Sequence, residues 1–155
     1  MNFIEVITKY QDKILDDGVL IEYNLFFSNL YKKYCRFAID EKEEIEKLND
    51  VIKKIRESDK NAEIYVCTYG IDFMDDGIYI YADTLWINTT IDLEKIYTYF
   101  ENYREVEPSD IVLLSEDEMI DGIMTLVFSS NGNVEDYKAF IQKKELNKIK
   151  SLYWD

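Results

Sequence analysis

The side chains of this sequence that could take part in chemistry are almost all carboxylates. The chain of 155 residues has no histidine, and its only cysteines are Cys35 and Cys67. Histidine exchanges protons most readily near neutral pH, and many serine and cysteine nucleophiles depend on it. The sequence therefore excludes Ser-His-Asp and Cys-His catalysis and zinc sites that contain histidine. Two thiols also cannot form a four-thiolate zinc site within one chain.

The carboxylates that stand out form two groups in the sequence. These groups are Asp72, Asp75, Asp76 and Asp83, and Glu116, Asp117, Glu118 and Asp121. Carboxylate oxygens bind Mg²⁺, Mn²⁺ or Ca²⁺, and a pair of carboxylates can act as acid and base. Neither spacing fits the twelve-residue calcium loop, and no glycine-rich phosphate loop is present. A metal-dependent carboxylate enzyme is thus one alternative function, although we predict no cofactor, no metal site and no catalytic residue.

Negative charge is concentrated in the middle of the chain. Residues 61–133 contain 15 Asp and Glu against only Lys95 and Arg104, and the whole chain has a net charge of −14. Such a charge distribution attracts a basic partner and accelerates its association, whereas it repels nucleic acids and anionic membranes. We therefore expect a basic protein as the partner, and neither nucleic acid nor membrane.

The first 60 residues predict helices. Apolar side chains recur at helical spacing in residues 2–15, 19–38 and 40–57. Residues 16–18 are expected to end the first helix, and Asp40 to begin the third with a capping box. The charged side chains between the apolar positions are expected to face solvent.

After residue 61 the spacing becomes that of strands. Glu63–Met74 and Ile78–Ile87 predict a β-hairpin around the turn Asp75–Gly77, with kinks at Gly70 and near Asp83.

The rest of the chain completes the predicted fold. A helix at 93–100, strands at 111–114 and 123–128 with an acidic loop between them, and a last helix after 134 follow the hairpin. We predict one α+β domain over residues 1–155, in the order ααα-ββ-α-ββ-α, with a mainly antiparallel four-stranded sheet. Its parts are the helical residues 1–60, the acidic sheet of 61–133 and the C-terminal helix of 134–155.

The predicted hairpin separates aliphatic from aromatic side chains. Residues two positions apart on a strand point to the same face, so isoleucine and valine share one face and tyrosine the other. The tyrosines are Tyr65, Tyr69, Tyr79 and Tyr81. Two interpretations stay open: helices cover both faces and the tyrosines belong to the core, or the tyrosine face is a recognition surface.

A small, strongly acidic α+β chain with tyrosines among carboxylates resembles the bacterial immunity proteins. The resemblance is one of character over the whole chain and involves no motif. The residues that carry it are Tyr79, Tyr81, Asp75, Asp76, Asp83 and the loop 116–121. Immunity proteins bind basic toxins, often nucleases, and block the active site by imitating its anionic substrate. The resemblance implies an inhibitor of a basic toxin or nuclease.

We therefore predict a non-enzymatic, acidic protein-binding module. The abundance of Ile, Lys, Asn and Tyr indicates an AT-rich bacterial genome. The sequence shows neither a signal peptide nor a membrane-spanning run, so we expect a cytoplasmic protein. In that compartment the two cysteines are expected to be buried free thiols. The predicted binding residues are Tyr65, Tyr69, Asp72, Asp75, Asp76, Tyr79, Tyr81, Asp83, Glu116, Asp117 and Glu118. A structural protein that self-associates through its tyrosine face is a further alternative.

Overall fold

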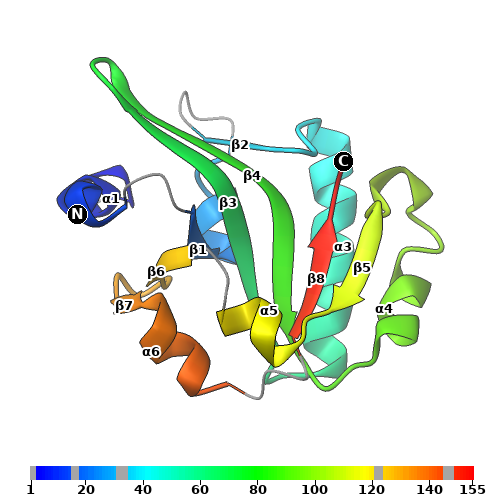
Figure 1. The fold of residues 1–155 in the computed structure, drawn as a ribbon. Helices are drawn as coiled ribbons and strands as arrows, with labels where there is room; N and C mark the ends of the chain where they lie inside the picture. Colours follow the sequence, from blue (N-terminus) through cyan, green and yellow to red (C-terminus); the bar gives the residue numbers. More distant parts are fainter. Residues whose placement is uncertain (1–2, 15–17, 31–34, 121–123, 145–148) are drawn as a thin grey trace.

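One mixed β-sheet with helices on both of its faces organises the chain (Figure 1). The structure, a computed structural model, describes residues 3–14, 18–30, 35–120, 124–144 and 149–155. Within these ranges the sheet has eight strands. Seven of them pair in the order β5-β8-β4-β3-β1-β6-β7, and the eighth, β2, pairs with residues 80–82 of β4. The strands are β1 Gly18–Glu22, β2 Cys35–Phe37, β3 Glu63–Met74, β4 Gly77–Asn88, β5 Asp110–Leu113, β6 Met124–Phe128, β7 Val134–Asp136 and β8 Ile149–Tyr153.

The sheet is mostly antiparallel. Only the pairs β1–β6 and β2–β4 are parallel among the pairings of the described strands. The α-helices are α1 Phe3–Lys9, α2 Tyr23–Phe27, α3 Lys42–Ser58, α4 Leu93–Tyr99, α5 Glu116–Ile120 and α6 Tyr137–Gln142. Short 3-10 helices follow at Gln11–Lys13 and Arg104–Val106.

The two faces of the sheet bury separate hydrophobic clusters. On one face, α3 contributes an apolar stripe that includes Leu48, Ile52 and Ile55. On the other face, Met119 of α5 and Phe140 of α6 pack over Cys67, Trp86 and their neighbours. Because helices cover both faces at the centre of the sheet, its strands are apolar on both sides.

The predicted four-stranded sheet and the predicted element order are wrong. Residues 19–38, predicted as one helix, contain β1, α2 and β2. Val19, Leu20 and Ile21 are all buried, and Leu20 lies in a different cluster from its two neighbours. A strand that is covered on both faces shows no alternation, so its apolar run can pass for part of a helix.

The predicted C-terminal helix is also wrong, because residues 134–155 contain β7, α6 and β8. Ile149 and Leu152 have the spacing of neighbours on a helix, but they lie on opposite faces of the sheet. The loop predicted at 115–122 contains α5. Parts of the predictions for residues 2, 15–17, 31–34, 121–123 and 145–148 fall outside the described residues.

Both thiols are free and buried, as predicted, although Cys35 lies on β2 instead of on a helix. The third helix, the hairpin, the helix after residue 92 and the strand after residue 110 were predicted close to their observed bounds.

Candidate functional site

The long hairpin of β3 and β4 contains one extra residue on each strand. Asp83 in β4 lies between the residues that pair with Cys67 and Thr68, and Tyr69 in β3 lies between Thr68 and Gly70. These two bulges lie where the sequence predicts kinks. Each extra residue reverses the face on which the following side chains lie. We call residues 69–83 the arm; β2 pairs with residues 80–82 of the arm, and in Figure 1 the tip extends beyond the rest of the sheet.

The bulges decide which side chains the arm exposes. Beyond them, Ile71, Ile78 and Ile80 lie in the same hydrophobic cluster as α3. In the hairpin register, Asp72 pairs with Tyr79 between these isoleucines, so both point to the opposite face. No helix in the described ranges buries that opposite face, and we call it the outer surface of the arm.

Stacked tyrosines form the centre of the outer surface. The rings of Tyr69 and Tyr81 lie 6.1 Å apart at an interplanar angle of 25°. Tyr81 pairs with Gly70, which has no side chain to separate the two rings. Tyr69 is 64% exposed and Met74, nearer the tip, is 58% exposed. Tyr69 and Met74 thus present large apolar groups to solvent on a part of the hairpin whose strands are paired.

Carboxylates surround these tyrosines. Asp72, Asp75 and Asp76 are exposed at and near the tip. The Tyr79 hydroxyl donates a hydrogen bond of 2.8 Å to Asp76 Oδ2. Since Asp76 is held by Tyr79, at least one of the three negative charges has a defined position on the outer surface.

Tyr65 does not belong to the outer surface, because α6 covers it. Its ring contacts Phe140 edge-to-face at 5.1 Å, and its hydroxyl donates to Glu63. Burial and the neighbouring Glu63 carboxylate raise the pKa of the Tyr65 phenol. The tyrosines therefore differ in their surroundings. Tyr65 packs against the core, as in the first interpretation, whereas Tyr69 is exposed.

Asp83 lies at the base of the arm. Its carboxylate accepts a hydrogen bond of 2.8 Å from the Thr84 hydroxyl, and its backbone carbonyl accepts one from the Trp154 amide. Burial raises the pKa of the Cys67 thiol, and the charge of Asp83 raises it further. Asp83 thus contributes to the bulge and to the local charge, away from the tip.

The second acidic group begins α5. The Ser115 hydroxyl accepts from the Glu118 amide at 3.1 Å, and Glu118 Oε1 accepts from the Ser115 amide at 3.3 Å, which is a capping box. Glu116 and Asp117 are exposed beside it. Figure 1 places α5 far from the tip of the arm, so the structure does not bring the two acidic groups together. In the described part of the chain, no three carboxylates or thiols converge to hold a metal ion.

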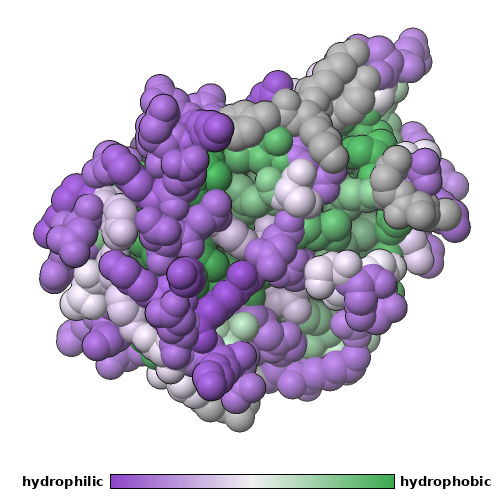
Figure 2. All heavy atoms as spheres, turned by 180° about the vertical axis from the view of Figure 1, so that it is seen from behind, coloured by the Kyte–Doolittle hydropathy of each residue, from purple (hydrophilic) through white to green (hydrophobic). Residues whose placement is uncertain are grey.

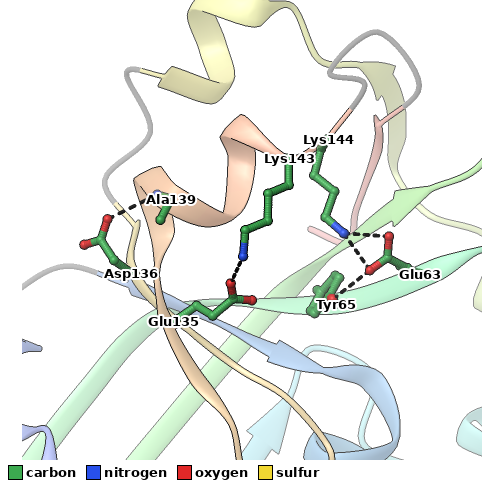
Figure 3. Close-up of polar contacts among 7 residues, drawn as sticks. All are labelled: Glu63, Tyr65, Glu135, Asp136, Ala139, Lys143 and Lys144. Carbon is green, nitrogen blue, oxygen red and sulfur yellow. Dashed lines mark hydrogen bonds and ion pairs between the residues drawn. The ribbon is translucent and has the colours of Figure 1, made fainter.

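A polar network that the sequence did not predict holds α6 over the sheet (Figure 3). Lys144 donates to both carboxylate oxygens of Glu63, at 2.6 and 2.7 Å, and Asn88 donates to the same carboxylate at 3.1 Å. Lys143 pairs with Glu135 of β7. Lys144 and Glu63 are 81 positions apart, so no local pattern could have indicated the pair. The network fixes α6, and Phe140 of α6 covers the half-buried ring of Tyr65.

No protein-family model, no curated protein and no solved structure matches this chain. No helix in the described ranges combines the length and the apolar character that crossing a membrane requires.

Proposed function

We propose that this chain is a non-enzymatic binding protein that docks a basic protein on the outer surface of its arm. The observation that carries the proposal is the exposed ring of Tyr69, stacked on half-buried Tyr81, beside the exposed carboxylates of Asp72, Asp75 and Asp76. Tyrosines supply rigid contact area at the centre of many interfaces, while charges at the rim orient the partner and raise its association rate.

The proposal takes its most specific form as an immunity-type inhibitor that acts in the cytoplasm on a basic toxin or nuclease. The carboxylates near the tip would pair with lysines or arginines that normally bind the anionic substrate, and the tyrosines would anchor the contact. Glu116 and Asp117 would contribute only to the long-range field, because α5 lies far from the tip. Salt screens such distant charges beyond about 8 Å at physiological ionic strength.

The first test compares two variants that remove equal charge. The arm variant carries Asp72→Asn, Asp75→Asn and Asp76→Asn, and the control carries Asp110→Asn, Glu116→Gln and Asp117→Asn. All six residues are exposed. Wild type and both variants would capture partners from the native host. The captured protein would then be purified, and its affinity and activity measured at low and physiological salt.

We expect a basic partner whose activity the wild type inhibits. The arm variant should bind it at least about tenfold more weakly at physiological salt, since each charged contact is worth about 1.5 kcal/mol or more. The control variant should lose affinity mainly at low salt. Equal binding by all three proteins would refute docking through the arm. A partner whose activity is unchanged would refute the inhibitor form of the proposal.

A further inference from the structure

A groove of about 650 Å³ lies between α2 and α3, on the face of the sheet opposite the outer surface of the arm. Figure 2 shows the molecule from behind, where hydrophobic surface is visible between hydrophilic side chains. The apolar part of the groove comes from Tyr23, Phe27 and Ile52. Tyr23 and Ile52 are buried core residues, so this part of the wall is well supported.

The edge of the groove is basic although the chain as a whole is acidic. Lys53 and Arg56 lie one turn apart on α3, and Lys60 follows just beyond its end. Glu57 is the one acidic residue among those that line the groove. Neither Lys53 nor Lys60 forms an ion pair with another residue in the described ranges. With Arg56, these two ammonium groups outnumber the Glu57 carboxylate among the described residues that line the groove.

Arg56 is held in place at the wall of the groove. Its guanidinium carbon lies 5.6 Å from the centre of the Tyr23 ring, and Nη1 donates to Asn24 Oδ1 at 3.2 Å. Glu22 lies 3.6 Å from Nη2 on the other side. The Tyr23 hydroxyl in turn donates to Asn49 of α3. Because a guanidinium has five N–H donors, Arg56 keeps donors for a ligand while its position is already fixed.

We propose that this groove binds a small organic anion, with its apolar body against Phe27 and Ile52 and its carboxylate, sulfonate or phosphate among Lys53, Arg56 and Lys60. A concave site with an apolar wall and a few convergent polar groups is the usual form of a small-molecule site. A polyanion would be repelled by the acidic remainder of the surface, whereas a small anion meets mainly the local positive charge. The inference is independent of the binding role proposed for the arm.

The test uses anilinonaphthalene sulfonate, a fluorescent flat anion, and the uncharged N-phenylnaphthylamine as its matched probe. Titrations would compare wild type with a Lys53→Gln, Lys60→Gln variant and with a Lys9→Gln, Lys138→Gln control. The control removes the same charge from exposed lysines on α1 and α6. Thermal unfolding would confirm that all three proteins are equally folded.

We expect saturable binding of the sulfonate by wild type and the control, and a dissociation constant at least about tenfold higher for the Lys53, Lys60 variant. The uncharged probe should bind wild type and that variant equally. Three results would overturn the inference: no saturable binding of the sulfonate, equal loss in both double variants, or equal affinity of wild type for the two probes.

Discussion

The Lys144 ammonium group is shared by the two carboxylate oxygens of Glu63, at 2.6 and 2.7 Å. This pair joins the chain two residues after α6 to the first residue of β3. The Lys144 side chain is only 14% exposed, whereas that of Glu63 is 38% exposed. Loss of Glu63 would therefore leave an almost buried ammonium group without its main partner.

Glu63→Gln should lower the free energy of unfolding at pH 7 by about 1 kcal/mol, a value reduced for the partial exposure of Glu63. Burial raises the pKa of Glu63, but Lys144, Asn88 and Tyr65 outweigh it, and the net pKa is lowered. The stabilisation that the Glu63 carboxylate provides is thus complete above about pH 4.3, the pKa of glutamate in the unfolded chain. It disappears as the pH falls through the pKa of Glu63 in the folded protein. Urea unfolding from pH 7 to pH 3 should show the variant and wild type converging. A difference that persists at low pH would contradict this.

Tyr65→Ala and Tyr69→Ala should have opposite consequences. Tyr65 packs on Phe140 under α6, so its truncation should cost about 2–3 kcal/mol of stability. Tyr69→Ala should change stability by less than about 0.5 kcal/mol, because its ring is mostly exposed, but should weaken partner binding. Chemical denaturation measures both values. Equal destabilisation by the two changes would mean that the arm packs against more of the protein than the structure shows.

Thr68→Val should destabilise the junction of the arm with β1. The buried Thr68 hydroxyl accepts from the Val19 amide at 2.9 Å and lies 3.2 Å from the Val19 carbonyl, to which it donates. Valine has nearly the same shape but leaves both backbone groups without partners, at a cost of about 3 kcal/mol. Thr68→Ser keeps the hydroxyl and should cost only about 1 kcal/mol for the lost methyl group. Equal midpoints of denaturation for the two variants would contradict the role of the hydroxyl.

Alkaline pH should unfold the protein through its buried phenols. Burial raises the pKa of Tyr23, Tyr65 and Tyr137 above the ordinary value. In the unfolded chain these phenols lose their protons near pH 10, so stability should be constant below that pH and fall above it. The slope is at most about 1.4 kcal/mol per pH unit for each shielded phenol. The loss of circular dichroism between about pH 9 and pH 12 would measure this transition.

The matched control for this pH dependence is Tyr23→Phe, which removes one buried phenol. The variant loses the hydrogen bond to Asn49 at every pH, but its stability should fall less steeply above pH 10 than that of wild type. An unchanged slope would exclude Tyr23 from the alkaline transition.

Elements with one covered face could be predicted from the sequence. The stripe of α3 and the alternation of the arm each contrast a buried face with an exposed one, and α3 and the hairpin were located within two residues. Val19–Ile21 and Ile149–Tyr153 could not be predicted, because these strands lie inside the sheet with helices or clusters on both faces. In β8 even Lys150 is buried, since its ammonium group donates to the Thr89 carbonyl at 2.7 Å.

The candidate site could be predicted only in part, for a related reason. The alternation of Ile78–Tyr81 correctly separates aliphatic from tyrosine side chains on the β4 side of the arm, whereas the bulge puts Tyr69 and Ile71 on opposite faces. It cannot indicate that α6 covers Tyr65 and stops short of Tyr69, because that depends on the distant pair of Lys144 and Glu63. Likewise, two acidic groups that look like one charged region in the sequence lie on the arm and on α5, which the structure separates (Figure 1).

The place of β8 between β5 and β4 has a consequence for biosynthesis. β5 leaves the ribosome well before β8 does, yet β8 is its only strand partner in the described sheet. Until β8 arrives, β5 has no sheet to join, and Val112 and Leu113 lie on a segment without a strand neighbour. Pairings between distant segments form slowly and leave apolar segments exposed to wrong partners. During synthesis there is therefore an interval in which β5 and the β8-facing edge of β4 both lack their strand partner.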